Sequence, residues 1–240
     1  HGYFSSWIAM TAARLGDITA RMHLALAGAR GHDLAPRPID AAMLNGWADE
    51  ILVDLDTLIA VDDDVVAALP DHRAALEARI TAIRTLRDPG LAIRIHGDFH
   101  LGQVLRTDAG WTVLDFEGEP LRSVEHRRRR HSPLRDVAGM LRSFDYAAEV
   151  ALIERTTPAD PVWSDLVAHG RSWAWANREA FWAAYVDRTA NTVLLPDPGA
   201  ALTLRRAFEI QKAVYEVGYE LAHRPQWAAV PLSFLLEATP

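Results

Sequence analysis

In most of the chain, apolar residues recur at the spacing of an α-helix, but residues 91–114 do not follow this pattern. Residues 91–95 alternate as a short strand does. Residues 103–106 and 111–114 are typical of two further strands, and the turn-forming residues 107–110 between them predict a β-hairpin. The sequence therefore predicts an α+β fold that is predominantly α-helical, with one small β-hairpin insert.

The remainder of the chain predicts helices bounded by residues that begin or end them. Apolar residues recur at helical spacing over residues 5–29. Asp40 is expected to cap a long helix that runs towards Leu69 and is interrupted by the acidic run 62–64. Another helix begins at Pro70 and stops at Pro89. Residues 36–38 are expected to be a connector.

The second half of the chain also predicts helices that are bounded by capping residues and prolines. Ser132 and Pro133 predict an N-cap and a first-turn proline for a helix that runs to about Tyr146. Everything beyond it is expected to be helical, with breaks at the proline-containing segments 158–161 and 196–199.

Composition excludes several classes of protein. Half of the 240 residues are apolar, which is enough to bury a substantial core. The formal charge of 25 basic minus 32 acidic residues, −7, argues against a general nucleic-acid binder. The sequence has no cysteine, so disulfides and thiolate metal sites are excluded. It has no apolar run of about eighteen residues and no leader pattern, so we expect no membrane partner and a cytoplasmic location.

Acidic and amide side chains flank the hairpin. Asp98 follows the first strand and a glycine, while Gln103 and Asp115 stand at the two ends of the hairpin, with Glu117 close behind. Phosphoryl transfer requires a carboxylate that orients the attacking hydroxyl and accepts its proton. Mg²⁺ prefers amide and carboxylate oxygens. The pattern therefore predicts Asp98 as catalytic base and Gln103 and Asp115 as metal ligands, with Glu117 as an additional metal group.

Five segments together resemble a known family of kinases. They are residues 96–103, 114–120, 132–146, 212–216 and 224–225. They are similar to the C-terminal lobe of the aminoglycoside phosphotransferase-like (eukaryotic-protein-kinase-like) family, and more narrowly to its maltokinase-like sugar kinases. The resemblance covers nearly the whole chain.

This resemblance implies an ATP- and Mg²⁺-dependent sugar kinase. It implies that Asp98 is the base, that Gln103 and Asp115 hold the cofactor, and that the sugar lies near a further set of residues: Asp98, His100, Glu209, Lys212, Tyr215 and Glu216.

The resemblance also implies a division of residues 1–240. We expect a helical subregion over 1–90, the catalytic loop and hairpin over 91–131, and a helical sugar-binding subregion over 132–240. The Gly-rich loop and strand lysine that grip the nucleotide belong to the family's N-terminal lobe and do not occur here. A missing N-terminal lobe or partner is therefore expected, and the isolated lobe is expected to be weak or inactive.

Two positions depart from the family pattern. Gln103 stands where the wider superfamily usually has Asn, which keeps the same oxygen on a longer side chain. Gln211 stands where maltokinases tend to have an acidic residue. The second change favours an aminosugar such as glucosamine as much as it favours maltose.

Two functions of other classes compete with this interpretation. His96, Asp98 and His100 have the residue types of a zinc or manganese site, as in a metal-dependent hydrolase. A non-catalytic kinase-like lobe that binds a carbohydrate or a partner protein would explain the missing nucleotide lobe.

Overall fold

The chain folds into two units, and each unit is built from two separate stretches of sequence. The computed structural model describes residues 2–31, 34–108, 110–118 and 123–237. The first unit contains residues 1–38 and 90–195, and the second contains residues 39–89 and 196–240. The subregions expected over 1–90 and 132–240 are each shared between both units. The expected subregion 91–131 falls entirely in the first unit.

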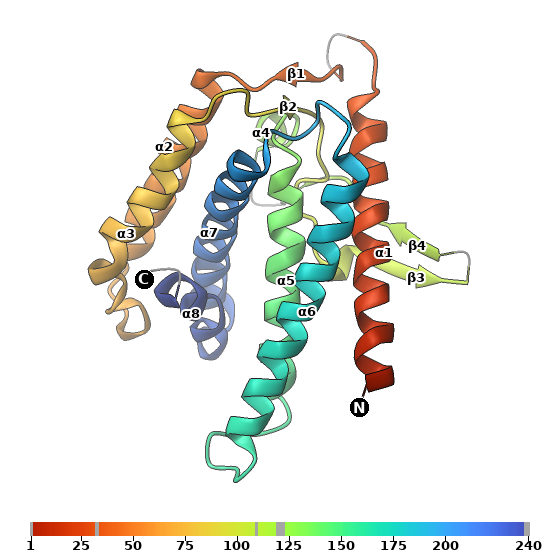
Figure 1. Cartoon of the computed structure of the whole chain (residues 1–240). Helices are drawn as coiled ribbons and strands as arrows, with labels where there is room; N and C mark the ends of the chain where they lie inside the picture. Colours follow the sequence, from red (N-terminus) through yellow and green to blue (C-terminus); the bar gives the residue numbers. More distant parts are fainter. Residues whose placement is uncertain (1, 32–33, 109, 119–122, 238–240) are drawn as a thin grey trace. The chain divides into compact units, whose positions relative to one another are not determined.

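Three long helices form the body of the first unit. They are α1 (Gly2–Ala27), α5 (Leu134–Ile153) and α6 (Trp163–Thr189), and α6 packs against both of the others (Figure 1). Gly16 on α1 lies so close to the Phe181 carbonyl on α6 that an added Cβ would overlap it. Phe181 is buried beside Phe144 of α5, with ring centroids 6.2 Å apart. Small residues at the helix contact and aromatic residues beside it therefore build this core.

Two short antiparallel sheets complete the first unit. β3 (Val104–Thr107) pairs with β4 (Gly110–Val113), so the predicted hairpin is confirmed; turn residue Ala109 lies outside the described residues. β2 (Leu91–Ala92) pairs with β1 (Arg37–Pro38), within the segment expected to be a connector. A 3₁₀ turn, η3 (Leu101–Gln103), precedes β3, and a short helix, α4 (Val124–Arg127), follows the hairpin.

The strand predicted over residues 91–95 is shorter than expected. It ends at Ala92, and Ile93 makes only an isolated bridge to His131. Just beyond, the amides of His96 and Gly97 donate to the side chain of Asp136. A side-chain acceptor therefore takes the place of a partner strand.

The second unit is entirely helical among its described residues. Its elements are α2 (Ala41–Ile59), η1 (Asp64–Val66), α3 (Leu69–Thr81), η2 (Ala82–Thr85), α7 (Pro198–His223), η4 (Pro225–Trp227) and α8 (Ala229–Glu237). α7 packs against α2, α3 and α8. Trp47 of α2 meets Phe208 of α7 edge to face, with ring centroids 5.7 Å apart.

Helix ends differ in part from the sequence-based predictions. The cap at Asp40 is confirmed, because its carboxylate accepts from the Met43 amide at 2.8 Å. The helix it begins ends at Ile59 and a separate 3₁₀ turn follows at Asp64–Val66, so the interruption expected near residues 62–64 is confirmed. The predicted N-cap at Ser132 is wrong by one residue, because Pro133 takes the N-cap position and α5 begins at Leu134. The helix continues past Tyr146 to Ile153, since no breaking residue intervenes. The helical remainder and both of its breaks are confirmed.

No helix among the described residues is both long and apolar enough to cross a membrane.

Candidate active site

A buried carboxylate holds the loop that carries Asp98. Asp136, in the first turn of α5, accepts the amide of His96 at 2.7 Å and the amide of Gly97 at 2.9 Å, one on each carboxylate oxygen. Both amides precede Asp98 directly in the chain. Because each oxygen accepts a separate amide, the direction in which the loop leaves Asp136 is defined.

Two further buried side chains continue this contact into the helical core. His23 of α1 places Nε2 3.0 Å from Oδ2 of Asp136, and Nδ1 2.8 Å from the hydroxyl of Tyr185 on α6. Burial alone would raise the pKa of Asp136, but the hydrogen bonds from His23 and the Gly97 amide outweigh it and lower that pKa below its ordinary value. Asp136 is therefore a buried, ionised acceptor.

His96 connects the Asp98 loop to the end of the hairpin. Its side chain is buried, at 1% exposure, and its Nε2 lies 2.6 Å from the carbonyl of Leu114, which follows β4. Gly97 has φ +87°, and a Cβ there would lie 3.2 Å from the Cα of Gly118. The loop before Asp98 and the loop after β4 are thus in close contact, and only glycine fits both conditions at residue 97.

Asp98 itself is partly open to solvent. Its side chain is 20% exposed, and its Oδ2 lies 3.9 Å from Nε2 of His100. Nδ1 of His100 accepts the amide of Gly102 at 3.0 Å and so caps the following 3₁₀ turn. A carboxylate in this setting is held by its backbone and remains accessible to a substrate, as a general base must be.

The hydrolase alternative finds no support in this geometry. His96 directs Nε2 to the Leu114 carbonyl, and its Nδ1 lies 3.4 Å from the amide of Asp98. His100 uses Nδ1 for the Gly102 amide. Within the described part of the chain, no group of three or more His, Asp or Glu side chains is arranged to hold a metal ion.

Gln103 and Asp115 meet across the base of the hairpin. Nε2 of Gln103 lies 3.3 Å from Oδ2 of Asp115, and the Gln103 carbonyl accepts the amide of Leu114 at 2.9 Å. Asp115 is exposed and has φ +57°, a left-handed backbone conformation that is uncommon for residues other than glycine. Strained, exposed carboxylates of this kind are found at binding sites.

Glu117 makes a contact of its own, through its backbone. Its side chain is exposed, and its carbonyl accepts from Nη1 of Arg127 at 3.0 Å. No contact between described residues brings its carboxylate to Gln103 or Asp115. Its role as a further metal group stays a prediction.

Four of the six predicted sugar-binding residues lie on α7, in the second unit, whereas Asp98 and His100 belong to the first. Glu209 is buried, at 3% exposure, and its Oε1 pairs with Nε of Arg205 at 3.2 Å. Lys212 lies over the ring of Tyr215, 4.9 Å from its centroid. Lys212, Tyr215 and Glu216 are all partly exposed. These three are therefore open to a ligand, whereas Glu209 is held in an ion pair.

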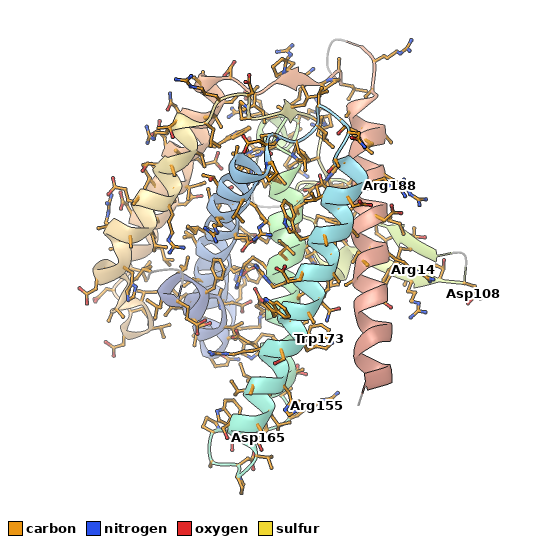
Figure 2. The ribbon with its side chains drawn as sticks, in the orientation of Figure 1. Arg14, Asp108, Arg155, Asp165, Trp173 and Arg188 are labelled. Atoms are coloured by element: carbon orange, nitrogen blue, oxygen red, sulfur yellow. The ribbon has the colours of Figure 1, made fainter. Side chains whose placement is uncertain are left out.

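A cavity of about 290 Å³ lies elsewhere in the first unit, between α1 and the hairpin. It is lined by charged residues of both elements, including Asp17 of α1. Arg14 and Asp108, which also line it, are labelled in Figure 2. Asp17 is already paired with Arg188 of α6 at 2.5 Å. Neither Asp98 nor Asp115 lines this cavity, so it is separate from the candidate active site.

Sequence reasoning missed the three buried residues behind the loop. Asp136 carried a detectable signal, since it is an acidic residue in a helix turn whose neighbours Leu134 and Val137 are buried. An ionised group in such a position requires hydrogen-bond donors. His23 and Tyr185 carried no local signal, because only the packing of α1 and α6 brings them to α5.

Comparison with known proteins finds glucosamine kinases among the relatives of this chain. No family model matches the chain. A glucosamine kinase of Streptacidiphilus jiangxiensis is 35% identical over 237 residues, which is 96% of this chain and 50% of that protein. A glucosamine kinase of Mycolicibacterium smegmatis (strain ATCC 700084 / mc(2)155) is 32% identical over 222 residues, with 90% and 50% covered.

Solved structures agree with these relatives. A glucosamine kinase in complex with glucosamine, ADP and inorganic phosphate matches with a TM-score of 0.78 and 32% identity, covering 94% of this chain and 54% of that one. Crystal form B of glucosamine kinase matches with a TM-score of 0.82 and 30% identity, covering 98% and 54%. The chain is thus similar in sequence and in fold to glucosamine kinases, and it spans about half the length of the curated relatives that it matches.

Proposed function

We propose that the chain carries the base and the metal-binding residues of an ATP- and Mg²⁺-dependent glucosamine kinase. Two features together carry this proposal. Asp98 is accessible and follows an anchored loop, and an amide–carboxylate pair, Gln103 and Asp115, lies at the base of the hairpin that comes next in the chain. The similarity to glucosamine kinases supports the choice of nucleotide and sugar. The placement in the aminoglycoside phosphotransferase-like family, and more narrowly among maltokinases, finds no support in these relatives.

In the proposed reaction, Asp98 orients a sugar hydroxyl towards the γ-phosphate. The hydroxyl oxygen bonds to phosphorus as the bond to ADP breaks, and the carboxylate accepts the hydroxyl proton. Because the backbone before Asp98 is held by Asp136, the carboxylate does not have to be ordered when substrate binds.

Gln103 and Asp115 fit a magnesium ion by the chemistry of their oxygens. One amide oxygen and one exposed carboxylate suit an ion that keeps its other positions for water and phosphate. Bound there, Mg²⁺ would neutralise charge on the phosphate oxygens. The contact in this structure uses the amide nitrogen of Gln103, so binding requires that its amide turn over, by rotation about the last side-chain bond.

We assign recognition of the sugar to the exposed face of α7. Lys212 and Tyr215 offer a donor and an aromatic face to the hydroxyls and ring of a sugar. Glu216 is the acidic member of the set that is open to solvent, and we assign it to the ammonium group of glucosamine. Gln211 is buried and donates to Glu50 at 3.3 Å, so it shapes the helix contact rather than this face.

A phosphotransfer screen of the intact protein tests the proposal. ATP and Mg²⁺ are supplied with glucosamine, maltose or glucose, and the products are identified by mass. We expect glucosamine phosphate at the highest kcat/KM. Phosphorylation of maltose alone would reject the assigned sugar, and nucleotide binding without transfer to any sugar would favour a non-catalytic lobe.

A further inference from the structure

The buried contact behind the Asp98 loop contains more side chains than anchoring the loop requires. Asp136 already accepts two backbone amides from the loop. His23 adds a third donor to the same carboxylate, and Tyr185 lies behind His23. His23, Asp136 and Tyr185 are all buried, and they come from three different helices.

Hydrogen-bond chemistry assigns a direction to this chain of residues. Burial and the nearby carboxylate raise the pKa of Tyr185 well above its ordinary value, so its phenol keeps its proton. When the hydroxyl donates to Nδ1 of His23, Nε2 carries the proton and donates to Asp136. This arrangement is assigned from the network, and it gives each of the three side chains a hydrogen-bond partner.

The consequence for the loop follows from the shared oxygen. Oδ2 of Asp136 accepts hydrogen bonds from both Nε2 of His23 and the amide of His96, while Oδ1 accepts one from the amide of Gly97. The bond from His23 is a third one on this carboxylate, so it restricts rotation about the last side-chain bond more than the two loop amides do alone. The more restricted carboxylate in turn holds more tightly the two residues that precede Asp98.

We propose that His23 and Tyr185 are positioning residues that act on Asp98 through Asp136. The part that concerns catalysis rests on the proposed function, whereas the part that concerns the loop does not. If His23 and Tyr185 had only a structural role, their hydrogen bonds would stabilise the packing of the helices and would not affect turnover. A positioning role also predicts slower turnover with unchanged substrate binding.

Tyr185→Phe removes only the hydroxyl and keeps the ring, which stacks on Phe181. The matched control is Thr19→Val, which removes a buried hydroxyl from α1 that donates to the Leu15 carbonyl of its own helix. In the intact protein we expect Tyr185→Phe to lower kcat about 10-fold at unchanged KM, and Thr19→Val to leave kcat unchanged.

Amide hydrogen exchange of the loop provides a readout that needs no activity. The amides of His96 and Gly97 should exchange about 10-fold faster in Tyr185→Phe and at the wild-type rate in Thr19→Val. His23→Leu should have a larger effect than Tyr185→Phe, and His23→Gln should restore part of the protection, since its amide can still donate to Asp136.

The outcomes separate the two proposals. If Tyr185→Phe and His23→Gln match Thr19→Val in both exchange and kcat, the positioning role is wrong. If exchange changes as expected but the wild-type protein phosphorylates no sugar, the proposed function fails while the control of the loop stands. Faster exchange with unchanged kcat in an active enzyme would also overturn the action on Asp98.

Discussion

The two loops that carry the candidate chemistry are held in opposite ways. The loop before Asp98 is bonded to a buried carboxylate and contains a buried histidine. The loop after β4 exposes Asp115 and Glu117, and its Asp115 adopts a left-handed backbone. We infer that the base is placed by folding, whereas the metal ligands are completed when ion and nucleotide bind. The variants below test this difference, from the largest expected effect to the smallest.

Removal of the buried anchor should have the largest effect on stability. Asp136→Ala leaves the two loop amides and His23 without their acceptor, so we expect the free energy of unfolding to fall by about 3–5 kcal/mol. Asp136→Asn keeps the shape and one acceptor oxygen and should lose less. Denaturant unfolding measures both, and wild-type stability of Asp136→Asn would mean that packing rather than charge holds the loop.

A methyl group at Gly139 should displace the Asp98 loop from the side of α5. A Cβ there would lie 2.6 Å from the carbonyl of Phe99, the residue after Asp98, and backbone cannot move aside cheaply. We expect Gly139→Ala to lower the unfolding free energy by about 1–3 kcal/mol. Gly46→Ala is the matched control, since a Cβ at that helical position meets nothing within 4 Å and should be neutral or stabilising.

The charge of Asp136 should also make stability depend on pH. Its folded pKa is lower than the ordinary 3.8, so its contribution is complete above pH 3.8 and is lost as pH falls through the folded value. The difference in unfolding free energy between wild type and Asp136→Asn should therefore shrink below pH 3.8. Asp62→Asn, at an exposed site, serves as control, and a difference that grows on acidification would contradict the account.

Substitution in the exposed loop should leave stability nearly unchanged. Asp115→Asn keeps a residue type that tolerates a left-handed backbone, so the unfolding free energy should change by no more than about 0.5 kcal/mol. In the intact enzyme, the Mg²⁺ concentration for half-maximal rate should rise, because a carboxylate ligand is lost. A loss of stability as large as that of Asp136→Ala would remove the contrast between the loops.

The same contrast explains what could be predicted from the sequence. The hairpin and the residues at its ends follow local rules of alternation and turn chemistry, so Asp98, Gln103 and Asp115 could be selected and the last two are in contact. The strand over 91–95 could not be judged locally, because its last residues bond to Asp136, about forty positions away. His23 and Tyr185 are farther still, and only helix packing joins them.

The central claim is that Asp98 is the base of a sugar kinase, and one rate measurement tests it most directly. In the intact protein with ATP, Mg²⁺ and glucosamine, Asp98→Asn should lower kcat by about 10²–10⁴-fold while the unfolding free energy and sugar affinity stay near wild type. Wild-type turnover by this folded variant would contradict the account.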